Sequence, residues 1–159
     1  MTFKLTSPAF GQNGSIPPQY TCEGDDISPP LAWYDIPPGT KSLALIVDDP
    51  DAPDPAKPQR VYVHWIVYNI SPITLKLPLN SAMSGLPLRA QHGTNDWGKQ
   101  NYGGPCPPIG RHRYFFKLYA LDTTLNGLKN PTKAQLEEAM AGHLVGHAEL
   151  VATYEKRNK

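Results

Sequence analysis

The sequence lacks long apolar runs and an excess of charge of one sign. Its densest apolar stretches, residues 43–47 and 61–70, are far shorter than the roughly 18 residues that a helix needs to cross a bilayer. The 15 Lys and Arg are balanced by 14 Asp and Glu, and the net charge of +1 creates no broad field for nucleic acid or an anionic membrane. We therefore expect no nucleic-acid partner and no stable membrane insertion.

Cysteine is also scarce, because only Cys22 and Cys106 are present. They are too few and too far apart for a structural zinc site, and they leave either one long-range disulfide or two free thiols. Residues 1–10 contain one Lys and no apolar stretch of signal-peptide length, which indicates a cytoplasmic or already matured protein. In a cytoplasmic chain, reduced and buried cysteines are the default expectation.

Charged residues make up only 18% of the chain, while prolines number 18 and glycines 13, a balance that disfavours long helices. The length of 159 residues suits one domain over 1–159. Segments rich in β-branched and aromatic residues predict strands at 42–47, 61–70 and 114–121. Within 61–70 both alternating sets are largely apolar, so we expect a central strand with His64 in a closed environment.

One helix is predicted near the C-terminus. Thr132 and Gln135 form a T-x-x-Q capping box, and apolar residues follow at helical spacing to about His143. Alternation over 147–155 favours a terminal strand, although a continued helix fits nearly as well. The predicted fold class is mainly β, an antiparallel two-sheet β-sandwich with a few short peripheral helices.

The commonest enzyme signatures, including G-x-S-x-G, H-E-x-x-H and the Walker loop, are missing. His143 and His147 are four residues apart, which on one helix would suit a metal. No third ligand is evident, and Gly142 and Gly146 weaken a helix there, so we predict packing or surface histidines, no metal and no cofactor.

The candidate site consists of Asp49, His64 and His112, each at or near the end of a predicted strand. Asp49 opens the turn Asp-Pro-Asp-Ala-Pro, whose prolines hold the carboxylate in an extended loop. His112 shares strand parity with Tyr114, so an imidazole and a phenol project from one face. An ordinary acidic turn and a hydrogen-bonded core histidine are the alternatives.

A loop over 102–110, Tyr-Gly-Gly-Pro-Cys-Pro-Pro-Ile-Gly, precedes His112. Its glycines permit close approach to a ligand, and their N–H groups together with histidine donors can hold an anion. A plain Gly/Pro turn is the alternative interpretation.

Together these motifs make the chain resemble the phosphatidylethanolamine-binding proteins, the Raf kinase inhibitor-like family, in its bacterial and archaeal branch. The resemblance rests on Ser-Pro-Pro-Leu-Ala-Trp at 28–33, Asp-Pro-Asp-Ala-Pro at 49–53, Val-His-Trp at 63–65, and Gly-Gly-Pro-Cys-Pro-Pro at 103–108 leading into His-Arg-Tyr at 112–114. These stand in family order, and residues 132–154 also resemble the bacterial branch, so nearly the whole chain is covered.

The resemblance implies a two-sheet sandwich with a small pocket for phosphate-like groups at one end. The ligand-binding residues it implies are Asp49, Ala52, Pro53, His64, Gly104, Pro107, His112 and Tyr114. Arg113 is expected to tie loops together rather than to touch ligand. The chain departs from the family pattern at two places that flank this pocket. Only Arg111 separates Gly110 from His112, and residues 54–59 are rich in proline. Both departures affect the shape of the pocket rim and the size of ligand that fits.

We expect the imidazole N–H groups of His64 and His112, backbone N–H groups of 103–108 and the Tyr114 hydroxyl to receive one phosphate, carboxylate or phosphoryl head group. Asp49 would orient a histidine and favour its protonated form. A disulfide between Cys22 and Cys106 would brace this site, because Cys106 lies in the pocket loop.

The predicted function is a small-anion-binding regulatory module that acts on a kinase, a protease or another protein, as the resemblance permits. A homodimer is a further expectation. The alternative is a hydrolase or other enzyme that uses Asp49, His64 and His112 for acid–base chemistry, but no activated nucleophile accompanies them.

Overall fold

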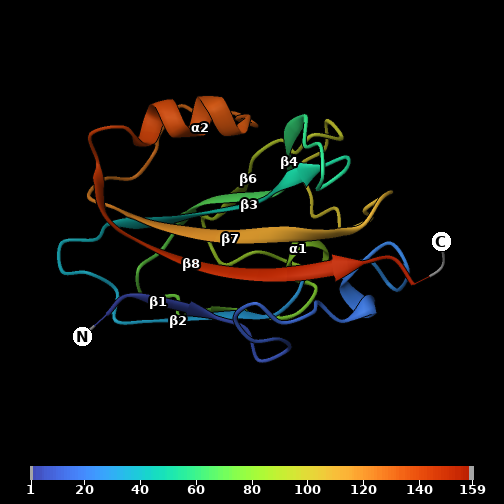
Figure 1. The fold of residues 1–159 in the computed structure, drawn as a ribbon. Coiled ribbons are helices and arrows are strands. Elements are labelled where there is room, and N and C mark those ends of the chain that lie inside the picture. Colours follow the sequence, from blue (N-terminus) through green and yellow to red (C-terminus); the bar gives the residue numbers. More distant parts are fainter. Residues whose placement is uncertain (1, 158–159) are drawn as a thin grey trace.

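The computed structural model describes residues 2–157 and arranges them as two antiparallel sheets with a helix packed outside (Figure 1). The strands are β1 (Lys4–Thr6), β2 (Leu31–Tyr34), β3 (Ser42–Ala52), β4 (Arg60–Ile70), β5 (Lys76–Leu77), β6 (Gln91–His92), β7 (Arg111–Leu121) and β8 (Leu144–Glu155). The helices are the 3-10 turn η1 (Pro18–Tyr20), α1 (Ser81–Ser84) and α2 (Lys133–Met140).

The smaller sheet has the order β1-β2-β5, and the larger has the order β6-β4-β3-β7-β8. Figure 1 shows the larger sheet as the middle layer, with α2 over one face and the smaller sheet against the other. The predicted mainly β class and the two-sheet sandwich are confirmed.

Apolar side chains fill both gaps between the layers, because the long strands bury both of their faces. Leu45, Trp65 and Phe116 belong to the core between the two sheets. Ile46 and Ile66 pack on the opposite face, where Leu136 of α2 covers them. Burial on both faces explains why β4 shows little polar alternation, as expected of a central strand.

The helix α2 begins with the predicted capping box. The Thr132 hydroxyl accepts a hydrogen bond from the Gln135 N–H, and the Gln135 side chain accepts one from the Thr132 N–H. The helix ends at Met140, short of the predicted His143, because Ala141 is extended and Gly142 has a φ of +83°. The chain reverses direction there and continues as β8. The predicted terminal strand over 147–155 is therefore confirmed, and the alternative of a continued helix is wrong.

The site strands run further than the sequence predicts. β3 continues to Ala52, so Asp49 lies within a strand, whereas the sequence places it in a turn. The reason is that β4 keeps pairing with this segment, opposite Asp49 through Tyr62 and opposite Ala52 through Arg60, in an irregular register that accommodates the prolines.

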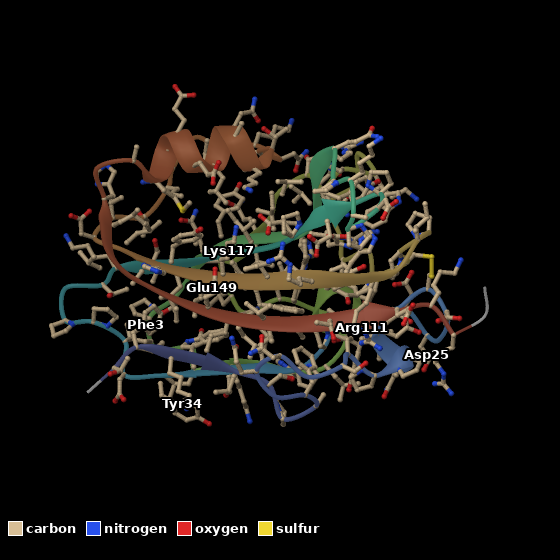
Figure 2. The ribbon with its side chains drawn as sticks, viewed as in Figure 1. Phe3, Asp25, Tyr34, Arg111, Lys117 and Glu149 are labelled. Atoms are coloured by element: carbon tan, nitrogen blue, oxygen red, sulfur yellow. A yellow bond between two sulfur atoms is a disulfide. The ribbon has the colours of Figure 1, made fainter. Side chains whose placement is uncertain are left out.

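Side chains on the outer surfaces are more polar and exposed. Figure 2 shows Lys117 and Glu149 on the neighbouring strands β7 and β8, where the two residues are paired. Within residues 2–157 no helix is long and apolar enough to cross a membrane.

Candidate functional site

A β-bulge in β4 sets the position of His64. Val47 pairs with Trp65, but the next residue of β3, Asp48, pairs with Val63, so His64 is the extra residue between two pairs. Trp65 belongs to the core between the sheets and Val63 to the core beneath α2. The bulge therefore interrupts the alternation of faces and turns the His64 imidazole towards the end of the sandwich where Asp49 and Tyr114 lie.

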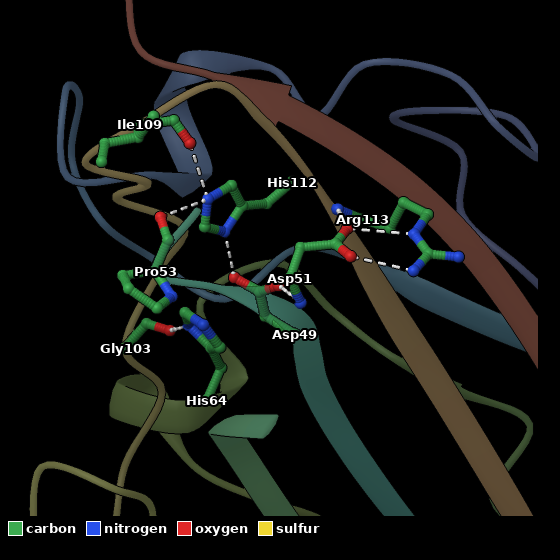
Figure 3. A network of polar contacts seen from close by, with 8 residues as sticks. All are labelled: Asp49, Asp51, Pro53, His64, Gly103, Ile109, His112 and Arg113. Carbon is green, nitrogen blue, oxygen red and sulfur yellow. Dashed lines mark hydrogen bonds and ion pairs between the residues drawn. The ribbon is translucent and has the colours of Figure 1, made fainter. Parts of the chain in front are cut away.

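Asp49 and His112 form a buried pair across β3 and β7. Asp49 Oδ2 lies 2.6 Å from His112 Nδ1, and Asp49 Oδ1 accepts a hydrogen bond of 2.7 Å from the Asp51 N–H. Both side chains are almost fully buried. Figure 3 shows Asp49 between His112 and Asp51, so each carboxylate oxygen has a protein partner.

The second ring nitrogen of His112 is also used within the protein. Nε2 lies 2.9 Å from the Ile109 carbonyl oxygen and 3.1 Å from that of Pro53 (Figure 3). Carboxylate and carbonyl oxygens accept only, so both ring nitrogens carry protons and the ring is an imidazolium paired with Asp49. His112 thus has no N–H left for a ligand, which differs from the expectation that it donates to the head group.

His64 uses one ring nitrogen and leaves the other to the cavity. Nδ1 lies 2.7 Å from the Gly103 carbonyl oxygen, so Nδ1 carries the proton and donates it (Figure 3). Burial lowers the pKa of His64 below its usual value, although the Gly103 hydrogen bond and nearby carboxylates oppose this shift. Among residues 2–157, none hydrogen-bonds to His64 Nε2, and the side chain lines the cavity.

Tyr114 contributes a hydroxyl to the same cavity. Its side chain is only 1% exposed and packs edge-on against His64, with ring centroids 5.2 Å apart. In the described part of the chain its hydroxyl makes no hydrogen bond, and the side chain lines the cavity. Burial and the Asp49 carboxylate raise the pKa of Tyr114 well above its usual value, so the phenol keeps its proton and can donate it.

The Gly-Pro loop is held by its glycine N–H groups. The Gly103 N–H donates to the His64 carbonyl oxygen at 3.1 Å, and the Gly104 N–H donates to Asp26 Oδ1 at 2.8 Å. Added Cβ atoms would overlap the Trp97 ring at Gly103 and Asp26 at Gly104, which explains the two glycines. These N–H groups are therefore not available to a ligand, contrary to the expectation from sequence.

A disulfide joins the loop to the N-terminal segment. Cys22 and Cys106 are bonded, with Cα atoms 5.4 Å apart and a sequence separation of 84. The Cys22 N–H also donates to the Pro105 carbonyl oxygen at 3.1 Å. The default expectation of reduced thiols is wrong, because the packing of the two segments brings the sulfur atoms together; the bridged alternative holds.

Arg113 ties β3 to β7 beside the pocket, as the resemblance implies. Its guanidinium donates to both carboxylate oxygens of Asp51, at 3.0 and 2.9 Å, and its backbone N–H donates to Asp51 Oδ2 at 2.9 Å (Figure 3). The Arg113 side-chain hydrogen bonds lower the pKa of Asp51. Neither residue lines the cavity.

The cavity has a volume of about 430 Å³, within the range of small-molecule sites. Seven of the predicted residues line it, namely Asp49, Ala52, Pro53, His64, Pro107, His112 and Tyr114. The eighth predicted residue, Gly104, does not line the cavity, and its N–H donates to Asp26 Oδ1. The sequence analysis did not single out Gln59, Arg60, Tyr62, Trp97 and Pro108, which complete the lining together with Cys106.

An aromatic and cationic rim is the part that sequence reasoning missed. Trp97 is 44% exposed, and its ring centroid lies 5.1 Å from that of His64 and 4.8 Å from that of Tyr62. The Arg60 guanidinium lies over the Tyr62 ring and 3.6 Å from Asp96 Oδ2. The alternation of β4 could have indicated Arg60 and Tyr62, but no local signal marks Trp97. Residues 2–157 contain no cluster of three or more metal-ligating side chains.

Comparisons with known proteins agree with this geometry. Residues 6–155 match the family model described as phosphatidylethanolamine-binding protein. The UPF0098 protein of Methanothermobacter thermautotrophicus is 48% identical over 153 residues, which cover 96% of this chain and 98% of the relative.

Solved structures of phosphatidylethanolamine-binding protein homologues also match this chain over nearly its whole length. A phosphatidylethanolamine-binding protein homologue of Chlamydia trachomatis has a TM-score of 0.88 at 46% identity, with 98% of each chain covered. E. coli YbcL, described as a member of the mammalian family, has a TM-score of 0.88 at 32% identity, with 99% of this chain and all of YbcL covered.

Proposed function

Since the chain belongs to the phosphatidylethanolamine-binding protein family, we propose that its pocket binds a small oxyanion head group, of the phosphoryl or carboxylate type. One observation carries the proposal: the Tyr114 side chain is buried and lines the cavity, and its hydroxyl makes no hydrogen bond within residues 2–157. Buried polar groups in proteins nearly always have a partner, so this donor suits a group that comes from outside the chain.

The charges around the cavity support an anionic occupant. Asp49 is matched by the His112 imidazolium, so the buried pair adds no net charge to the pocket. Arg60 stands at the rim with about half of its side chain exposed. One cation and few donors suit weak binding of a free anion, with a Kd on the order of millimolar.

The same geometry supports binding rather than catalysis. An acid–base catalyst must exchange a proton with its substrate, but both ring nitrogens of His112 are occupied by Asp49 and backbone carbonyls, so of the two pocket histidines only His64 keeps a free nitrogen. The one cysteine in the lining, Cys106, is bonded to Cys22, and no serine lines the cavity among residues 2–157.

A regulatory role on a protein partner fits the rim. Trp97 and Arg60 are side chains of the types that dominate binding energy at protein interfaces, and both stand exposed at the mouth of the pocket. The anionic head would then belong to a phosphorylated or acidic segment of a kinase, a protease or another protein. Cytoplasmic location and a homodimer stay predictions.

Titration of inorganic phosphate, followed by the NMR signals of the His64 and His112 rings, tests the proposal. Saturable shifts of both rings are expected, and Tyr114→Phe should weaken binding about fivefold to tenfold because one hydrogen bond is lost. Tyr119→Phe, on the same strand but outside the lining, is the matched control and should bind as the unmodified protein does. Unmoved His64 and His112 signals at high phosphate would rule the proposal out.

A further inference from the structure

We propose that the floor of the pocket accepts one hydrogen bond from its ligand, and therefore selects an oxyanion that carries a P–OH group over sulfate and phosphodiesters. This inference rests on the proposed function above and specifies its ligand class.

The acceptor is His64 Nε2. The Gly103 carbonyl oxygen can only accept, so the proton of a neutral His64 is fixed at Nδ1, 2.7 Å away. Nε2 then presents a lone pair to the cavity that the ring lines. The bulge in β4 and the edge-on Trp97 ring hold the imidazole in this orientation. Rotation of the ring would break the Gly103 hydrogen bond.

The surroundings keep this nitrogen unprotonated. Asp49 and Asp48 on β3 and Asp26 in the N-terminal segment favour a proton on His64, but burial is the larger effect and lowers its pKa. The three rings in contact with it, those of Tyr62, Trp97 and Tyr114, carry no charge. On the β7 side, the His112 imidazolium is paired with Asp49.

Three other polar groups at the cavity are donors. The Tyr114 phenol keeps its proton. Cys106 lines the cavity, and its backbone N–H has no partner in residues 2–157. Arg60 adds a guanidinium at the rim. The Nε2 acceptor beside these donors matches a phosphoryl group with one P–OH and at least one P–O⁻.

Sulfate and phosphodiesters lack this proton at neutral pH. Their oxygens would place a lone pair against the lone pair of Nε2, unless His64 takes up a proton from solvent at a cost in affinity. Hydrogen phosphate keeps a P–OH at neutral pH, whereas a phosphomonoester keeps one only below its second pKa of about 6.

The experiment compares phosphate with sulfate, which has the same tetrahedral shape, by titration of the full chain in phosphate-free buffer. At about pH 7.5, phosphate should bind at least about tenfold more tightly than sulfate, because sulfate leaves a buried acceptor unsatisfied.

Two phosphate esters test whether the ligand must carry a P–OH group. Methyl phosphate should bind more tightly at about pH 5.5, where it carries the proton, than at about pH 7.5. Dimethyl phosphate, which never carries one in this range, should follow sulfate. His64→Gln, whose amide can rotate to present a donor, should reduce the preference for phosphate over sulfate to about twofold.

The outcomes distinguish the two proposals without dependence on the folding of the variant. Equal affinity of the unmodified protein for phosphate and sulfate at about pH 7.5 would overturn this inference and leave oxyanion binding intact. If no probe gives saturable binding at either pH, the proposed function fails, and this inference fails with it.

Discussion

Asp48 and Asp49 are neighbours in sequence, but their carboxylates lie on opposite faces of the larger sheet. Asp49 pairs with His112 at the pocket. Asp48 accepts hydrogen bonds from Lys117 at 3.2 Å and from Lys133 of α2 at 2.8 Å. One peptide unit of β3 thus fixes both the pocket pair and the attachment of the covering helix.

This arrangement predicts different effects for two matched substitutions. Asp49→Asn leaves a buried imidazolium without its counter-charge and should lower the free energy of unfolding by about 3 kcal/mol. Asp48→Asn should cost only about 1 kcal/mol, because Lys117 and Lys133 are partly exposed and can regain water. Urea unfolding measures both, and an Asp49→Asn protein as stable as the unmodified one would contradict the buried ion pair.

The Asp51–Arg113 pair predicts a dependence of stability on acid. The pKa of Asp51 is lowered in the folded protein, chiefly by Arg113, so its contribution is present above the unfolded value of 3.8 and is lost as pH falls through the lower folded value. Asp51→Asn should therefore lose stability at neutral pH, by about 2 kcal/mol, and less below about pH 3. Chemical unfolding at both pH values checks this, and a difference that grows on acidification would have the wrong sign.

Gly103→Ala should disturb the rim of the pocket. An added Cβ would overlap the Trp97 ring, which must then move away from His64. We expect a shift in tryptophan fluorescence and phosphate binding weakened about tenfold, with the fold retained. Gly39→Ser is a control at a glycine whose surroundings leave room for a Cβ far from the cavity, although its φ of +86° costs some stability. Unchanged phosphate binding in Gly103→Ala would show that the position of Trp97 does not matter.

The disulfide should contribute to stability, because it closes a long loop. Cys22 and Cys106 have a sequence separation of 84, and removal of the bond by Cys→Ser at both positions should lower the free energy of unfolding by about 3 kcal/mol. The unmodified protein after reduction should match the double variant. Counting thiols in denatured, non-reduced protein from its native cells comes first; two free thiols there would contradict the bridge.

Much of the fold follows from local sequence. β-Branched and aromatic runs mark β3, β4 and β7, and the Thr132 capping box marks α2. These features depend on near neighbours along the chain, so residue types reveal them. The shared parity of His112 and Tyr114 also holds, since both side chains are buried on one face of β7.

The hydrogen bonds of the site could not be predicted in this way. Whether His112 faces a ligand or two carbonyl oxygens depends on the positions of Pro53 and Ile109, which lie in separate loops. The bulge at His64 depends on the register between two strands, and strand register is a property of the assembled sheet. Sequence thus located the residues of the site but not the atoms that remain free in it.

The additional residue at His64 in β4 affects the pocket but not the core of the sandwich. Deleting one residue at His64 would remove the register shift between the Val47–Trp65 and Asp48–Val63 pairs, with the Val47–Trp65 pairing and the core contacts beyond it unchanged. A lineage can therefore gain or lose the imidazole through a small insertion or deletion, while the scaffold persists.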